Sequence, residues 1–112
     1  MSQIKITSGK GFHLKFSNGV TVSVQLGWGN YCANRDNAAV RDYPRPPNEC
    51  ASPDAEIAIW CDQWKDWHNW GGGVGDEVTG WASADEVGDI IAYCRQWVPG
   101  TPFTLTRKEA HQ

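Results

Sequence analysis

The most regular alternation of apolar and polar residues lies between Phe12 and Leu26. Every second residue is apolar over 12–16 and again over 20–26, which is the period of a strand with one buried face. Asn18-Gly19 separates the two runs, and this pair favours a tight hairpin turn because both residues tolerate a positive φ. The pattern therefore predicts an antiparallel hairpin with one apolar and one polar face.

A helical period follows Ser83. The apolar residues of this stretch recur at intervals of three and four, as on one face of a helix: Val87, Ile90, Ile91, Cys94 and Trp97 or Val98. Ser83 and Glu86 have the spacing of a capping box, in which each side chain accepts a hydrogen bond from the backbone N–H of the other residue. Pro99-Gly100 ends the pattern. We therefore predict an amphipathic helix over 83–98.

Shorter strands are expected at four further places, namely residues 4–7, 56–60, 77–81 and, as an edge strand, 103–106. Several antiparallel strands and one long helix predict an α+β fold: an antiparallel sheet built from hairpins, with one C-terminal amphipathic helix packed on a face. The 112 residues fit a single domain, 1–112. Within it we expect a long Pro-rich loop at about 36–53, with a helical turn near 37–41, and a frayed tail at about 107–112.

The tryptophans between residues 60 and 70 allow two interpretations. Four of them are spaced as on one face of a helix: Trp60, Trp64, Trp67 and Trp70. Residues 62–66 also have the composition of a turn, with 67–70 as the second strand of a hairpin. We favour the hairpin, because the β-branched Ile57 and Ile59 begin the run and a glycine-rich stretch ends it.

Composition indicates a cytoplasmic protein. No apolar run reaches the roughly 18 residues of a membrane span, and the N-terminus lacks the apolar core of a signal peptide, so no membrane partner is expected. The four cysteines show no C-x-x-C pair: Cys32, Cys50, Cys61 and Cys94. In a reducing compartment we expect free thiols rather than a Cys32–Cys50 disulfide or a metal site.

Charge is distributed unevenly along the chain. The net charge is +3 over 1–53, −8 over 54–89 and +2 over 90–112. The acidic stretch either aids solubility or forms an interaction surface, for which the candidate residues are Asp62, Asp66, Asp76 and Glu77. It argues against direct binding of duplex nucleic acid, because no basic stripe compensates for the repulsion of phosphates.

Most catalytic chemistry lacks a matching pattern. The glycine-rich run 71–75 is a weak match to a phosphate loop, because Asp76 and Glu77 follow it where a helix and a lysine are needed. A Cys61–His68 pair can be drawn, but no third group at a recognisable spacing would orient it. We therefore expect no metal, no cofactor and no catalytic residue, and a binding protein rather than an enzyme.

The segment 27–36 is the most informative for function. Its candidate ligand-binding residues are Trp28, Asn30, Tyr31 and Arg35. Aromatic rings offer stacking area, an amide reads hydrogen-bonding edges, and a guanidinium binds phosphate through two parallel hydrogen bonds. This set suits a nucleotide-like ligand. The alternative is that both rings belong to the core while Asn30 and Arg35 tie down the long loop.

At these residues the chain resembles small uncharacterised proteins encoded by phages and prophages. The resemblance rests on 16–25 continuing into Gly29-Asn30-Tyr31-Cys32-Ala33-Asn34-Arg35, and on Val78-Thr79-Gly80-Trp81 followed by 83–91. It covers about half of the chain. It implies a setting in which small accessory proteins block host defence by sequestering signal nucleotides or by occluding host proteins.

The first hypothesis for function is a non-enzymatic phage accessory protein that sequesters a small nucleotide-like signal of host defence. We expect it to act as a homo-oligomer in the host cell cytoplasm. The alternative is a protein-binding inhibitor whose acidic surface, within 54–89, imitates nucleic acid or covers a basic host defence protein. An enzyme is the third hypothesis.

Overall fold

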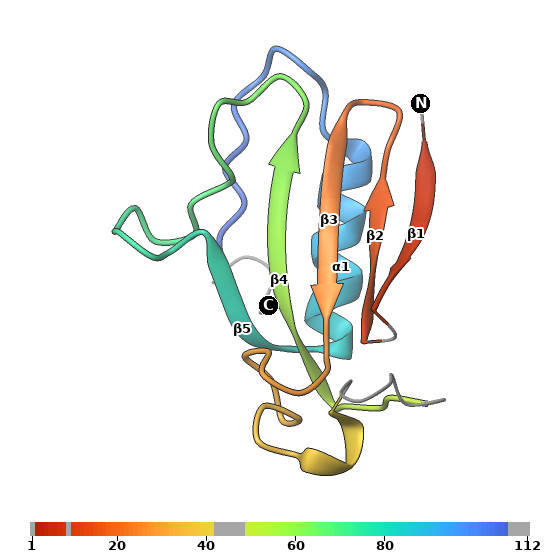
Figure 1. The fold of residues 1–112 in the computed structure, drawn as a ribbon. Coiled ribbons are helices and arrows are strands. Elements are labelled where there is room, and N and C mark those ends of the chain that lie inside the picture. The colour runs from red at the N-terminus through yellow and green to blue at the C-terminus, as the bar shows by residue number, and fades with distance from the viewer. Residues whose placement is uncertain (1, 9, 42–48, 108–112) are drawn as a thin grey trace.

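The strands lie in the sheet in the same order as in the sequence. The computed structural model describes residues 2–8, 10–41 and 49–107. Its elements are β1 (Gln3–Thr7), β2 (Gly11–Lys15), β3 (Val20–Gln25), the short 3-10 helix η1 (Ala38–Val40), β4 (Asp54–Cys61), β5 (Val78–Ser83) and α1 (Ala84–Gln96). All neighbouring strands are antiparallel, and α1 packs on one face of the sheet (Figure 1). The predicted α+β fold is confirmed.

The predicted hairpin is formed by β2 and β3, and its turn also contacts the end of α1. Gly19 has a φ of 91°, which the tight turn requires. The Asn18 Oδ1 accepts a hydrogen bond from the Val20 N–H at 3.0 Å. The Asn18 Nδ2 donates to the carbonyls of Cys94 and Trp97, both at 2.8 Å. One side chain therefore shapes the turn and supplies partners for carbonyls at the C-terminal end of α1, in its last turn and at its cap.

The core lies between α1 and the sheet. Its buried residues come from three strands, the helix and the C-terminal segment: Val20, Val22, Val24, Ala55, Ile57, Ile59, Cys61, Ala82, Ile90, Cys94 and Leu105. The other side of β3 is covered as well, since Thr21 and Ser23 are 5% and 6% exposed. Both faces of β3, the middle strand of the sheet, are therefore covered, although every second residue of this strand is polar.

The helix α1 begins with the predicted capping box. The Ser83 Oγ accepts from the Glu86 N–H at 3.1 Å, and the Glu86 Oε1 accepts from the Ser83 N–H at 3.0 Å. The helix ends at Gln96, just before Trp97. It is the longest helix in the described part of the chain, and no helix there is long and apolar enough to cross a membrane.

The prediction for the tryptophan-rich segment is wrong, because residues 62–77 form neither a second strand nor a helix. The next strand after β4, which pairs with it on the side away from β3, is β5. The rings of this segment instead meet rings from α1 and the C-terminal segment in one aromatic cluster: Trp64, His68, Trp70, Tyr93, Trp97 and Phe103. Side-chain packing holds the segment, and packing of this kind requires no regular backbone.

Residues 103–106 do not form the predicted edge strand. They run over the aromatic cluster, where the Leu105 side chain is buried and its carbonyl lies 2.9 Å from His68 Nε2. The Thr104 N–H donates to the Tyr93 hydroxyl at 2.9 Å. Side chains of His68 and Tyr93 thus hydrogen-bond to the backbone of this segment in place of a neighbouring strand. The edge strands of the sheet are β1 and β5.

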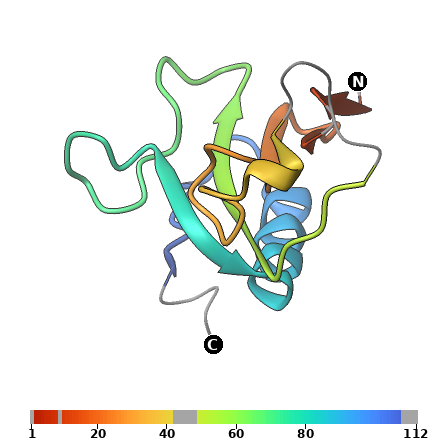
Figure 2. The ribbon, with the colours of Figure 1, turned by 60° about the horizontal axis from the view of Figure 1, so that its bottom comes forward.

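The predicted helical turn in the long loop is η1, which Asn37 caps by accepting from the Ala39 N–H at 3.1 Å. The part of this loop that follows β3 lies over the start of β4 (Figure 2). Residues 42–48 of the predicted Pro-rich loop lie outside the described residues, as do residues 108–112 of the predicted tail.

Candidate functional site

Polar side chains hold the loop that follows β3 against β4. Asn34 is only 6% exposed, and its Nδ2 donates to the carbonyls of Leu26 and Ala51, both at 2.8 Å. The Asp54 Oδ1 accepts from the Ala33 N–H at 2.7 Å. These hydrogen bonds tie the loop to Leu26, which precedes it, and to Ala51 and Asp54, which follow it. The backbone that carries the aromatic residues of the loop is therefore held in place.

Asn30 belongs to this support. Its Nδ2 donates to Glu56 Oε1 at 3.3 Å, and its Oδ1 accepts from the Gly27 N–H at 3.1 Å. The second Glu56 oxygen accepts from the Tyr31 N–H at 2.8 Å. Both ends of the Asn30 amide are therefore bonded within the chain, which is the loop-anchoring role that the sequence left open for it.

A β-bulge places an unpredicted tryptophan beside Tyr31. The pairing of β4 with β5 is regular on either side of one irregularity, with Ala55 opposite Ala82 and Ile57 opposite Thr79. Gly80 and Trp81 therefore both lie opposite Glu56, as in a bulge. Trp81 has a φ of 52°, a conformation that costs energy for a bulky residue. Its N–H donates to the Tyr31 carbonyl at 2.8 Å, which joins the bulge to the loop.

The rings of Tyr31 and Trp81 stack on the surface. Their centroids are 5.8 Å apart with an interplanar angle of 28°. The two residues are 44% and 50% exposed, so much of each ring meets solvent. The guanidinium carbon of Arg35 lies 5.1 Å from the Tyr31 ring centroid, within the range of a cation–π contact. The structure thus brings together two predicted residues, Tyr31 and Arg35, with one that the sequence did not single out.

An open pocket of about 580 Å³ adjoins this ring stack. Its lining residues are Cys32, Ala33, Arg35, Asp36, Asn37 and Trp81. Trp28 is not among them; it is 38% exposed and lies 5.8 Å from the guanidinium carbon of Arg41. Of the four predicted ligand-binding residues, only Arg35 lines the pocket, and Tyr31 adjoins it through its stacking on Trp81. Asn30 belongs to the support of the loop, and Trp28 contacts another arginine.

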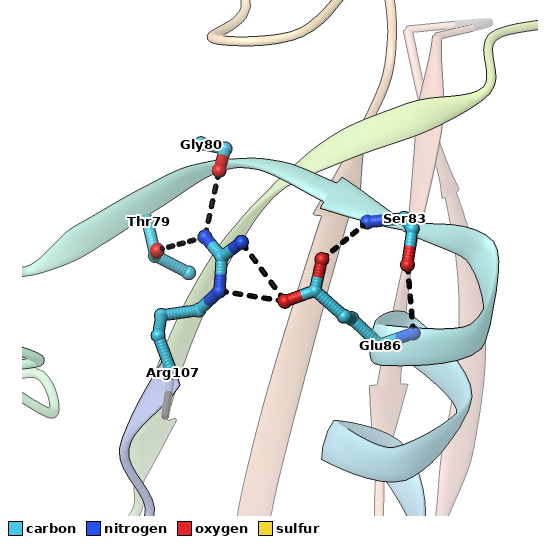
Figure 3. Close-up of polar contacts among 5 residues, drawn as sticks. All are labelled: Thr79, Gly80, Ser83, Glu86 and Arg107. Atoms are coloured by element: carbon cyan, nitrogen blue, oxygen red, sulfur yellow. Dashed lines mark hydrogen bonds and ion pairs between the residues drawn. The ribbon is translucent and has the colours of Figure 1, made fainter. Parts of the chain in front are cut away.

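Arg107 fixes the bulge from the other side (Figure 3). Its Nη1 donates to the Gly80 carbonyl and to Thr79 Oγ1, both at 2.7 Å. Its Nε and Nη2 lie 3.0 Å and 2.9 Å from Glu86 Oε2. Glu86 is 4% exposed and also closes the capping box with Ser83. Arg107, which the sequence places at the start of a frayed tail, therefore neutralises the charge of the buried Glu86 carboxylate. It also holds the backbone beside the exposed indole of Trp81.

The four candidate acidic residues differ in their contacts and in their exposure to solvent. Asp62 forms an ion pair with Lys15 at 2.8 Å. The Asp76 Oδ2 accepts from the Gly73 N–H at 3.0 Å and so shapes the glycine-rich loop. Asp66 is exposed and Glu77 is half-buried. Two of the four carboxylates are thus already engaged within the chain.

The thiols of the described residues are unpaired, and burial suppresses the ionisation of two of them. Burial is the main cause that raises the pKa of Cys32, and it raises the pKa of Cys94 to about 12. No group of three or more His, Cys, Asp or Glu is placed to hold a metal ion within the described ranges. Cys32 lines the pocket as a neutral thiol at neutral pH.

We expect the protein to lose stability as the pH falls below about 6.5, the ordinary pKa of histidine. Burial lowers the pKa of His68, although its hydrogen bond to the Leu105 carbonyl acts in the opposite direction. Burial and the nearby Lys5 lower the pKa of His13. Because the unfolded chain binds these protons more readily than the folded chain, the free energy of unfolding should be highest above the ordinary value and decrease below it.

Urea denaturation at a series of pH values between about 7.5 and 5.5 measures this slope. The glutamine of the variant His68→Gln does not titrate, so the free energy of unfolding of this variant should change less steeply with pH. His13 should contribute to the slope that remains. An identical slope in wild type and variant would show that His68 does not titrate differently on folding.

Comparisons of the chain with protein-family models, with curated proteins and with solved structures gave no match. The resemblance to phage proteins therefore stays a prediction, and the function has to be argued from the surface described above.

Proposed function

We propose that the chain binds a small nucleotide-like ligand at the Tyr31–Trp81 ring stack and sequesters it without converting it. The observation that carries the proposal is an exposed, stacked aromatic pair with a guanidinium beside it at the rim of an open pocket. A role in sequestering a signal of host defence is the biological setting that we expect for this binding.

The chemistry of the three side chains matches a base and a phosphate. A base that stacks on an aromatic ring gains about 1–3 kcal/mol, whichever base it is. Arg35 forms no ion pair among the residues that the structure describes, so its guanidinium is able to bind phosphate bidentately. The loop and the bulge position the two rings before any ligand arrives, which lowers the entropic cost of binding.

The charge of the pocket favours a ligand with few phosphates. Arg35 and Asp36 both line the pocket, so their charges oppose each other. The chain as a whole has a net charge of −3. A nucleoside monophosphate or a cyclic nucleotide, which carries less negative charge than a triphosphate, fits this balance best.

Titration calorimetry with a panel of linear, cyclic and cyclic di-nucleotides tests the proposal. For the ligand that binds, Arg35→Ala and Trp81→Asn should each weaken affinity by about tenfold or more. Asparagine is chosen because it tolerates the left-handed conformation of residue 81. Arg41→Ala is the matched control, since Arg41 contacts Trp28 and does not line the pocket.

Two results would contradict the proposal. One is wild-type nucleotide affinity in folded Arg35→Ala and Trp81→Asn proteins, with melting temperatures near that of the wild type. The other is chemical change of the ligand, detected by chromatography after the bound ligand has been released and recovered. The second result would retain the site but replace sequestration by an enzymatic reaction.

A further inference from the structure

A second group of aromatic and basic side chains lies on the face of the sheet opposite α1, the face turned toward the viewer in Figure 1. We call it the Trp67 patch; its residues are Lys5, His13, Lys15, Trp60 and Trp67. Strand register brings the first four together, because Lys5 pairs with His13, and Lys15 and Trp60 both pair with Thr21. None of these residues lines the pocket beside Trp81.

The rings of the patch form a layered stack. Trp60 and Trp67 are 4.9 Å apart with an interplanar angle of 25°, and the edge of His13 meets Trp60 at 5.1 Å. Trp67 is the outer ring and is 49% exposed. Burying one side of Trp67 against Trp60 immobilises the indole, while the exposed half remains available to a flat partner.

Two ammonium groups flank this stack. Lys5 is exposed on the edge strand β1 and forms no ion pair with any other described residue. Lys15 is paired with Asp62 at 2.8 Å, and the side chains of the pair are 33% and 57% exposed. Because this ion pair is open to solvent, an incoming anion can compete with Asp62 for Lys15.

We propose that the Trp67 patch binds single-stranded nucleic acid, with a base stacked on Trp67 and the neighbouring phosphates bound by Lys5 and Lys15. Sheet faces with exposed rings between basic side chains bind single strands by this combination of stacking and charge. A duplex keeps its bases stacked on each other and offers no free ring face to Trp67. The expectation that duplex nucleic acid does not bind is therefore compatible with the proposal.

Fluorescence anisotropy with a labelled oligothymidylate or oligouridylate of about 12 nucleotides tests the proposal. Trp67→Ala should weaken binding by about tenfold, the usual loss of one stacked base. Lys5→Gln should weaken binding and reduce its dependence on salt. If both lysines bind phosphates, wild-type affinity should fall about sevenfold between roughly 50 and 200 mM salt.

Asp62→Asn provides a test with the opposite sign. Removing this carboxylate frees Lys15 for phosphate, so the variant should bind the oligonucleotide more tightly than wild type. A purely structural role for Asp62 predicts equal or weaker binding. Trp28→Ala is the matched control for Trp67→Ala, because it alters an exposed indole that belongs neither to this patch nor to the lining of the pocket, and it should leave oligonucleotide affinity unchanged.

The proposal is overturned by no binding up to about 100 μM, the weak end of non-specific nucleic-acid binding. It is also overturned by equal affinity for a duplex of the same length, or by unchanged affinity in both Trp67→Ala and Lys5→Gln. If Trp67→Ala does not fold, as judged by circular dichroism, Lys5→Gln and Asp62→Asn decide the result, because both change exposed side chains. Loss of binding in Trp81→Asn alone would assign the strand to the pocket and not to this patch.

Discussion

Replacement of Arg107 by alanine should lower the free energy of unfolding by about 3–5 kcal/mol, the usual effect of breaking a buried ion pair by removing one of its members. The Glu86 carboxylate is 4% exposed, and Arg107 supplies its ion pair. The same substitution removes hydrogen bonds to Thr79 and to the Gly80 carbonyl. Chemical denaturation measured by tryptophan fluorescence would show the loss as a lower midpoint.

The double variant Arg107→Ala with Glu86→Gln separates charge from packing. Glutamine retains an oxygen that can accept from the Ser83 N–H, so the capping box survives without a buried charge. The double variant should therefore be more stable than Arg107→Ala alone. A single-variant loss below about 1 kcal/mol, the range of exposed ion pairs, would show that Glu86 is hydrated or protonated when Arg107 is absent.

Gly80→Ala should destabilise the protein by about 1–3 kcal/mol and separate Tyr31 from Trp81. A Cβ at residue 80 would lie 2.6 Å from the Tyr31 Cβ and 2.9 Å from the Tyr31 carbonyl oxygen. Neither atom is the end of a flexible side chain, so the loop itself has to move. We therefore expect nucleotide affinity to fall together with stability.

Gly88→Ala is the control for this change. Gly88 lies within α1, and a Cβ there would meet no atom within 4 Å apart from the neighbouring backbone of the helix itself. Alanine at this position should stabilise the helix by about 0.5–1 kcal/mol, because glycine loses more backbone entropy on folding. Opposite signs for the two substitutions would show that the effect at residue 80 comes from the contact with the loop. Equal effects would contradict this explanation.

The elements that the sequence predicts correctly are those determined by neighbouring residues. The alternation around Asn18-Gly19 is sufficient for the β2–β3 hairpin, and the Ser83–Glu86 spacing is sufficient for the start of α1. The tryptophan-rich segment is different, because its rings pack against Trp97 and Phe103, residues distant in the sequence. A local period cannot distinguish such packing from a helix face.

The candidate site was predictable only in part for the same reason. Tyr31 and Arg35 belong to one short segment, and the sequence indicates both. Trp81 becomes part of the site only through a bulge that depends on how β5 pairs with β4. A glycine beside a tryptophan within a short strand was the one available signal, since strand glycines often mark bulges or close backbone approach. Arg107 acts on Glu86 across 21 residues, and no local pattern indicates that pairing.

The amide of Asn18 has a consequence for the order of folding. It belongs to a hairpin that can form from residues close together in the chain, yet it bonds carbonyls 76 and 79 residues later. During synthesis the hairpin can therefore assemble early, while the end of α1 gains these partners only after Trp97 has emerged. Once the contact is made, fraying of the helix end breaks bonds to the first hairpin, so the earliest and latest parts of the fold should open as one cooperative unit.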